Sequence, residues 1–324
     1  MANATWTWRP LTTGDAPALA RVNAAVEAVD RTGEHFSEQD IRDELEDEVI
    51  DLERDSLAAL DADGDLVAYA RVHARADVRD VDRVRADGAV VPAARGRGLG
   101  RRLLAWSEER AERMHRARHP GTSGAVIVVV HESNAGKEAL VRAAGYEAIR
   151  WEHTMTHALD AALPDVPPTP RGLTLTPFSA ERDEAVRRAH CEAFADHWAS
   201  TPPDPARWAR WYTGSRAFRP DVSRLAVDGD QVAGYALSYF WAADAAATGV
   251  REAFLGQIGV RPAWRRRGLG GLLLAESLRS YQAAGYQRAA LAVDTANATG
   301  ALGLYTRAGF AVNDTWAIWA KPLG

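Results

Sequence analysis

The sequence predicts a mixed α/β (α+β) fold made of two tandem domains, each built around a mixed β-sheet. Both halves of the chain open with a short strand, a polar turn and an amphipathic helix, over residues 6–26 and 173–194. In addition, the stretch VVPAARGRGLGRRLLA recurs as VRPAWRRRGLGGLLLA at a constant offset of 170 positions. A repeat this long indicates duplication of a whole domain rather than a short solenoid repeat.

The remaining elements follow the same order in each half. Hairpin-like strands with Asp-Gly turns are predicted over residues 56–74 and 223–240. Next come a strand that ends in the Arg/Gly loop, the helix that this loop opens, another strand, a last helix and a closing strand. Between the halves, residues 160–172 are rich in proline, which is typical of an extended linker. We therefore expect domains at residues 1–159 and 173–324.

Composition excludes several classes of protein. A chain of 324 residues with 47% hydrophobic and 26% charged residues is long enough for two globular cores. Its net charge of −5 does not fit a nucleic-acid footprint, and no long uncharged run indicates a membrane span. The single cysteine, Cys191, and the scattered histidines offer no metal-ligand spacing. Because MANATWTWRP does not resemble an apolar signal segment, we expect a cytoplasmic protein.

The Arg/Gly loops predict a site for a phosphorylated ligand. A helix N-terminus exposes unpaired N–H groups and the positive end of the helix dipole, so it attracts anions. Glycines allow close approach of the backbone, and arginines add charge and forked donors. The residues involved are Arg265, Arg266, Arg267, Gly268, Leu269 and Gly270 in the second half, and Arg95, Gly96, Arg97, Gly98 and Gly100 in the first. We expect each loop to hold a phosphate, most simply a pyrophosphate.

The pattern Arg-x-x-Gly-x-Gly after a strand and a proline turn resembles the acyl-CoA loop of the GCN5-related N-acetyltransferase (GNAT) superfamily. The later stretch LAVDTANATGALGLYTRAGF, residues 291–310, resembles the second signature of that family. The resemblance covers both halves and implies a tandem GNAT protein, with a layout like that of mycothiol synthase. It implies acetyl-CoA as the acyl donor and a small-molecule primary amine as the acceptor. The chain is expected to be a monomer whose halves form a pseudo-dimer, or a homodimer.

The resemblance also implies roles for individual residues of the second half. The backbone N–H groups of Ile258, Gly259 and Val260 would bind the pantetheine arm and the thioester oxygen. Asn297 matches the family asparagine that contacts the cofactor arm. Tyr305 stands at the position of the general acid that protonates the departing thiolate, and a phenol with a pKa of about 10 suits that role. A packed helix tyrosine is the alternative.

The general base and the acceptor site are less specific in sequence. Glu252 has the same strand parity as Ile258 and Val260, which predicts that it lies on the same face of the sheet. Asp294 ends the next strand, and solvated or structural roles are open for both acids. His197 and Trp198 lie in a Trp- and Pro-rich region, residues 194–212, that predicts a substrate wall or an interface between the halves.

The first half lacks part of this machinery. Asn134 matches Asn297, but aligning the Gly-Tyr of residues 145–146 with the Gly-Phe of residues 309–310 places Val141 opposite Tyr305. A valine has no proton to donate. We therefore expect an acetyl-CoA-dependent N-acetyltransferase that works by direct amine attack, with its chemistry in the second half and a degenerate first half. Mycothiol synthase itself, which would acetylate a cysteinyl pseudodisaccharide, and a non-catalytic acyl-CoA sensor are the alternatives.

Overall fold

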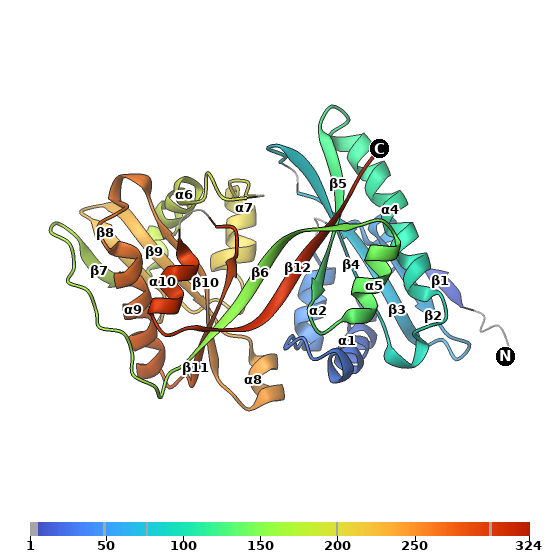
Figure 1. The fold of residues 1–324 in the computed structure, drawn as a ribbon, viewed down its shortest axis with the longest axis horizontal. Helices are drawn as coiled ribbons and strands as arrows, with labels where there is room; N and C mark the ends of the chain where they lie inside the picture. The colour runs from blue at the N-terminus through green and yellow to red at the C-terminus, as the bar shows by residue number, and fades with distance from the viewer. Residues whose placement is uncertain (1–5, 48–49, 76, 199, 298–299) are drawn as a thin grey trace. The chain divides into compact units, whose positions relative to one another are not determined.

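The computed structural model describes residues 6–47, 50–75, 77–198, 200–297 and 300–324. They form two compact units: Met1–Trp151 with Trp316–Gly324, and Glu152–Thr315. Figure 1 shows that each unit consists of a β-sheet with helices packed against it. The prediction of a mixed α/β fold in tandem is confirmed.

The first unit contains a β-sheet and five α-helices in its described part. In chain order its elements are β1 (Thr7–Arg9), α1 (Ala16–Asp30), α2 (Glu38–Leu45), α3 (Leu52–Asp55), β2 (Ser56–Leu60), β3 (Leu66–His73), β4 (Val81–Val90), α4 (Leu99–Arg118), β5 (Ser123–His131) and α5 (Ala135–Ala143). The sheet order is β1-β2-β3-β4-β5-β12, where β12 (Ala311–Pro322) comes from the C-terminal end of the chain. Only β4 and β5 pair in parallel among these strands.

The second unit repeats this plan. Its elements are β6 (Glu147–Ala158), β7 (Thr174–Pro177), α6 (Asp183–Ala193), α7 (Pro205–Trp208), β8 (Arg224–Asp228), β9 (Gln231–Tyr239), α8 (Ala242–Thr248), β10 (Glu252–Val260), α9 (Leu269–Ala283), β11 (Arg288–Asp294) and α10 (Ala301–Arg307). The sheet order is β6-β11-β10-β9-β8-β7, and only β10 and β11 pair in parallel within it.

The two halves exchange their closing strands. β6, from the first half of the sequence, pairs antiparallel with β11, whereas β12, from the second half, pairs antiparallel with β5 (Figure 1). The compact units therefore do not follow the expected boundaries at residues 159 and 173. The reason is that strand pairing assigns each closing strand to the other repeat, which spacing along the chain cannot reveal.

The proline-rich segment is part of the second unit rather than a connection between units. Residues 161–173 contain no helix or strand. Leu163 and Val166 pack against the core of the second unit, and Arg279 of α9 donates to the carbonyl oxygen of Pro164 at 2.8 Å. The chain instead passes between the units at residues 151–152 and 315–316.

Apolar residues of the second unit pack on both faces of its sheet. On one face, Leu272 and Leu273 of α9 pack with Ala236 of β9. On the other, Trp208 of α7 packs with Leu237, the next residue of β9. Because neighbouring strand residues point to opposite faces, this alternation places α9 and α10 on one side and α6 and α7 on the other.

Strand exchange predicts that each closing strand stabilises the repeat from which it does not derive. Trp319 in β12 is 4% exposed in the first unit's core, and Met155 in β6 is 1% exposed in the second unit's core. We expect Trp319→Ala to cost about 3–5 kcal/mol and Met155→Ala about 2–5 kcal/mol of folding free energy.

Hydrogen exchange measured strand by strand checks this crossed pattern. Trp319→Ala should lower protection in β5, and Met155→Ala should lower it in β11. Trp211→Ala is the control, because that side chain is 48% exposed and its loss should change stability by less than about 0.5 kcal/mol. Loss of protection in β11 rather than β5 on changing Trp319 would contradict the exchange.

Candidate functional site

β10 and β11 of the second unit pair over a short distance and then part. Their parallel pairing ends at Phe254 and Ala290, although β10 continues to Val260 and β11 to Asp294. No further pair joins these two strands in the described residues. The backbone groups on the β11 side of β10 are therefore left without a neighbouring strand, and backbone N–H groups require a hydrogen-bond partner.

Alternation along β10 decides which amides face that side. The N–H of Arg261, just after β10, donates to the carbonyl oxygen of Ala233 in β9 at 3.0 Å. In an antiparallel pair, successive residues face the partner strand and face away in turn. The N–H groups of Ile258 and Val260 therefore point away from β9, whereas that of Gly259 points toward it. Two of the three expected backbone donors are oriented to meet a ligand.

Glu252 lies away from these donors because β10 contains a β-bulge. The pairing of β10 with β9 shifts register between Leu255 and Gln257, so an extra residue reverses the strand parity. Leu255 and Ile258 consequently pack on the same face, the α9 side, although their numbers differ in parity. The parity argument for Glu252 is thus wrong. Its carboxylate is ion-paired with Arg288 at the beginning of β10.

The Arg/Gly loop follows the same path in both units. A 3₁₀ turn (Pro262–Trp264, and Pro92–Ala94 in the first unit) is followed by an extended arginine and then by two residues with positive φ. These are Arg266 (63°) and Gly268 (79°) in the second unit, and Gly96 (75°) and Gly98 (87°) in the first. A left-handed backbone conformation costs a non-glycine residue roughly 1–2 kcal/mol. The backbone of Arg266 is therefore strained, just before the N-terminus of α9.

The amides that open α9 are accessible to a ligand. Gly268 is its N-cap, and a Cβ at this position would meet nothing within 4 Å. Arg266 and Arg267 are exposed, whereas the Leu269 side chain is buried in the core. Gly270 packs against Leu304 of α10, 3.6 Å from where a Cβ would lie. The helix end thus combines free N–H groups, positive charge and open space.

The first arginine of each loop binds its own unit instead. Arg265 donates from Nε to the carbonyl oxygen of Val260 and from Nη2 to that of Ala193, the last residue of α6. Arg95 donates likewise to Val90 and forms a two-pronged ion pair with Asp30, the last residue of α1. Their side chains therefore fix the loop to the C-terminal end of α6 in the second unit and of α1 in the first, which differs from the expected phosphate contact.

Tyr305 lies on α10, in the apolar cluster that also contains Leu269 and against which Ile258 and Val260 pack. The residue is 6% exposed, and burial raises the pKa of its phenol to about 12. Among the described residues its hydroxyl has no hydrogen-bond partner. The group therefore keeps its proton at neutral pH.

The turn between β11 and α10 contains Asn297 and Asp294. The Asp294 Oδ1 accepts from the N–H of Ala296 at 2.9 Å, and its carbonyl oxygen accepts from the N–H of Asn297 at 3.1 Å. Asp294 is 7% exposed. These bonds give its carboxylate a structural part in shaping the turn that presents Asn297.

His197 and Trp198 lie in the turn after α6. The N–H of His197 donates to the carbonyl oxygen of Phe194 at 3.0 Å, and its Nδ1 lies 3.1 Å from the carbonyl oxygen of Trp198. The ring centroids of His197 and Phe194 are 5.4 Å apart. The substrate role of both residues stays a prediction.

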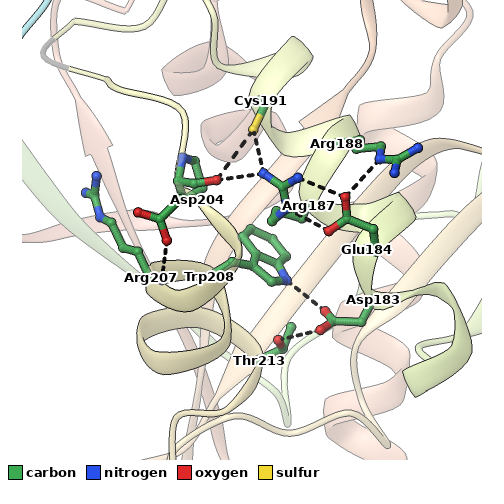
Figure 2. Close-up of polar contacts among 10 residues, drawn as sticks. Asp183, Glu184, Arg187, Arg188, Cys191, Asp204, Arg207, Trp208 and Thr213 are labelled. Carbon is green, nitrogen blue, oxygen red and sulfur yellow. Dashed lines mark hydrogen bonds and ion pairs between the residues drawn. The ribbon is translucent and has the colours of Figure 1, made fainter. Parts of the chain in front are cut away.

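Polar contacts attach α7 firmly to α6, as Figure 2 shows. The indole N–H of Trp208 donates to Asp183 at 2.7 Å, and the Thr213 hydroxyl donates to the same carboxylate at 3.2 Å. Arg187 bridges Glu184 and the carbonyl oxygen of Pro203. The helix pair therefore forms a rigid cover on the face of the sheet opposite α9.

Sequence reasoning missed a buried pair beneath this cover. Nδ1 of His190 lies 2.7 Å from the Tyr235 hydroxyl, and burial lowers the pKa of His190 to about 4, so the ring is neutral at pH 7. The Tyr235 ring lies against Gly259, where a Cβ would approach it to 2.6 Å. The first unit contains a similar contact, in which the Tyr69 hydroxyl donates to Oδ1 of Asn23 on α1 at 2.9 Å.

The first unit shares this architecture but differs in its key groups. The N–H of Tyr146 donates to the carbonyl oxygen of Val141, as that of Phe310 does to Tyr305, each at 3.1 Å. Val141 is 1% exposed. The two residues are thus structurally equivalent, and the first unit has an apolar group where the second has a phenol.

Asp30 links the two sides of the first unit's strand separation. β4 and β5 pair up to Arg85 and then part. Beyond this point Asp30 binds Arg95, in the loop after β4, at 2.6 and 2.8 Å, and Asn134, after β5, at 2.7 Å. Its carbonyl oxygen also accepts from Ser133 at 2.5 Å. In the second unit, Arg265 contacts the backbone of Ala193, which has no carboxylate to form such a link.

No helix in the described part of the chain is long and apolar enough to cross a membrane. Within the same residues, no three His, Cys, Asp or Glu side chains are grouped to hold a metal ion.

Comparison with known proteins agrees with the geometry. The model of the "Acetyltransferase (GNAT) family" matches residues 23–146 and 184–310. A mycothiol acetyltransferase of Geodermatophilus obscurus is 31% identical over 81% of this chain and 82% of its own. A solved N-acetyltransferase of Sphaerobacter thermophilus, described as GCN5-related, has a TM-score of 0.76 and 28% identity, with 98% of this chain and 95% of that one covered.

A tandem GNAT protein from the clavulanic acid biosynthesis pathway has the same fold, with a TM-score of 0.71 at 19% identity over 99% of both chains. The two family segments include both strand separations, both Arg/Gly loops and Tyr305. The chain therefore belongs to the GNAT family of N-acetyltransferases, as a member with two tandem GNAT domains.

Proposed function

We propose that this protein transfers the acetyl group of acetyl-CoA to a primary amine of a small molecule, with the chemistry in the second unit. One observation carries the proposal: the separated strand β10, the N-terminus of α9 and the Tyr305 side chain lie around the same part of the second unit. The helix N-terminus suits donor binding, the amides of β10 suit stabilisation of the oxyanion, and the phenol suits protonation of the departing thiolate.

The residues present fit acetyl-CoA as the acyl-donating substrate. The amides at the start of α9, with Arg266 and Arg267, suit the pyrophosphate, because a helix N-terminus and guanidinium groups favour anions. The outward N–H groups of Ile258 and Val260 suit the pantetheine arm and the thioester oxygen. The strain at Arg266 is consistent with such a role, since strained residues gather at functional sites.

The acyl transfer proceeds by direct attack. The amine nitrogen forms a bond to the acyl carbon while the carbon–sulfur bond breaks, the nitrogen loses a proton, and the sulfur gains one. Tyr305 supplies the proton to sulfur, because its raised pKa keeps the phenol protonated. Neither Glu252, paired with Arg288, nor Asp294, bound in its own turn, is assigned the base. Release of the amine proton to water is the simplest route.

The first unit is proposed to be catalytically silent and closed to the donor. Val141 replaces the acid, and the Asp30 link occupies both Arg95 and Asn134. A carboxylate that faces the position of a pyrophosphate also repels it. The first unit then serves as structural support, and the first half of the sequence supplies β6 to the second sheet.

The relatives' activity is a second candidate. Mycothiol acetyltransferase activity is supported by 31% identity across most of the chain, and would take a cysteinyl pseudodisaccharide as acceptor. A sensor that binds acyl-CoA without turnover is less favoured, because Tyr305 remains available as an acid.

Replacement of the loop glycines tests donor binding. Gly268→Glu adds a side chain and a negative charge at the α9 N-terminus, and we expect acetyl-CoA to bind at least about tenfold more weakly. Calorimetric titration should give one site per wild-type chain. Gly98→Glu is the matched control at the same turn of the first unit and should leave binding unchanged. Two sites in the wild type, one lost in each variant, would contradict a closed first unit.

Removal of the phenol tests the acid. We expect Tyr305→Phe to lower kcat by about 10²–10⁴-fold, because the thiolate loses its proton donor, with little change in the KM for acetyl-CoA. Steady-state assays with release of free thiol measure both constants. Tyr146→Phe removes a buried phenol from the first unit and serves as the control. An unchanged kcat in Tyr305→Phe would remove this residue from the mechanism.

Opening the Asp30 link tests the closed first unit. Asp30→Ala frees Arg95 and Asn134 and removes the negative charge, so a second, weaker acetyl-CoA site should become measurable by calorimetry. Asp15→Ala is the control, because it breaks another aspartate–arginine pair of the same unit, with Arg9, outside the loop. If the stoichiometry remains one in Asp30→Ala, another feature closes this unit.

A further inference from the structure

The second unit has an aromatic patch made of Tyr239, Trp241 and Phe254, in which Tyr239 is buried, at 5% exposed, and the other two rings reach the surface. Tyr239 and Trp241 stack with ring centroids 6.0 Å apart, and Trp241 meets Phe254 edge-on at 5.3 Å. Trp241 is 38% exposed, and Phe254 is partly exposed. An indole of this size that remains open to solvent marks a surface suited to an apolar ligand.

This patch is continuous with the point where β10 and β11 separate. Phe254 is the last residue of β10 that pairs with β11. The Tyr239 ring lies over Gly256 in the bulge, where a Cβ would approach it to 2.5 Å. The Tyr239 hydroxyl donates to Oε1 of Gln257 at 2.8 Å. A group that rests on the patch therefore lies beside the strand segment that leads to the Ile258 and Val260 donors.

The first unit has polar and ionic residues at the equivalent positions, and burial lowers the pKa of His73. Tyr239 pairs with Phe254 across the sheet, as His73 pairs with Arg85 in the first unit. Asp87, two residues beyond Arg85, is charged. Burial acts to raise the pKa of its carboxyl, but Arg85 and His73 outweigh burial and lower that pKa to about 2. The same scaffold thus carries an ionic surface in one unit and an aromatic one in the other, which indicates different ligand chemistry.

Acidic groups border the aromatic patch. Glu252 lies two residues before Phe254 and thus on the same face of β10. The carboxylates of Asp244 and Asp314 act on Glu252 and help burial to raise its pKa, with Arg288 as the opposing cation. These carboxylates beside the patch favour an ammonium ion over a second carboxylate.

From these surroundings we propose that the acceptor is a primary amine with an aromatic or other apolar body and no carboxylate, bound on Trp241 and Phe254 with Tyr239 behind them. The inference rests on the proposed function and names its substrate class. An alkylamine that bears an aromatic ring gains apolar contact and an attraction between its ammonium ion and the rings before it loses its proton. A polyhydroxylated acceptor finds few hydrogen-bonding groups on these three side chains.

Binding and turnover are to be measured separately on the full chain. 2-Phenylethylamine, phenylalanine, ethanolamine and glucosamine are titrated into protein saturated with coenzyme A, and the same four amines are assayed with acetyl-CoA. We expect 2-phenylethylamine to bind at least about tenfold more tightly than each of the others and to have the highest kcat/KM.

Variants locate the site. Phe254→Arg introduces the residue of the other unit and should weaken 2-phenylethylamine binding about tenfold or more while acetyl-CoA binding stays unchanged. Trp241→Ala, at the exposed edge of the patch, should act in the same direction, which guards against misfolding of the first variant. Arg85→Phe is the reciprocal control in the first unit and should have no effect.

The outcomes separate the two proposals. Equal or tighter binding of glucosamine, ethanolamine or phenylalanine would overturn the substrate class, as would 2-phenylethylamine binding that neither variant weakens. Tight binding of 2-phenylethylamine that depends on the patch, without transfer to any of the four amines, would uphold the binding inference and overturn the proposed acyl transfer.

Discussion

The candidate site of this protein depends on the place where β10 loses its neighbour. A strand inside a sheet satisfies its N–H groups on both sides, but after Phe254 β10 keeps only β9. The amides of Ile258 and Val260 are left facing the β11 side, and the strand leads directly to the Arg/Gly loop and α9. A ligand at this separation would meet the outward amides of β10, the Arg/Gly loop and Tyr305 together. The position of the bulge matters because it decides which side chains of β10 face that ligand.

The duplicated architecture shows how one scaffold supports different chemistry. Both units part their parallel strands, turn through a proline and two left-handed residues, and begin a helix. The second unit then presents a phenol and aromatic rings. In the first, Val141 replaces the phenol, Asp30 links the loop to Asn134, and polar and ionic side chains replace the rings. Backbone geometry is retained, while the side chains that would act on a ligand differ.

Because the closing strands are exchanged, the stability of each repeat depends on the other. The first unit needs β12 beside β5, and the second needs β6 beside β11. Each strand also contributes a buried side chain to its host core, Trp319 in one and Met155 in the other. Separating the halves at the proline-rich segment would therefore remove a strand from both sheets, so each half is needed to complete the other.

The sequence by itself determined the duplication, the family, the Arg/Gly loops and the contrast between Tyr305 and Val141, because these depend on residue type and spacing along the chain. Tertiary structure decided the rest. The bulge moved Glu252 off the expected face, Ala193 and Asp30 bound the first arginines of the loops, and strand pairing assigned β6 and β12 to opposite units. Each of these results depends on contacts between residues distant in sequence. Local periodicity carries no information about such contacts, since the same alternation of residues is compatible with a bulge, a different partner or a different sheet.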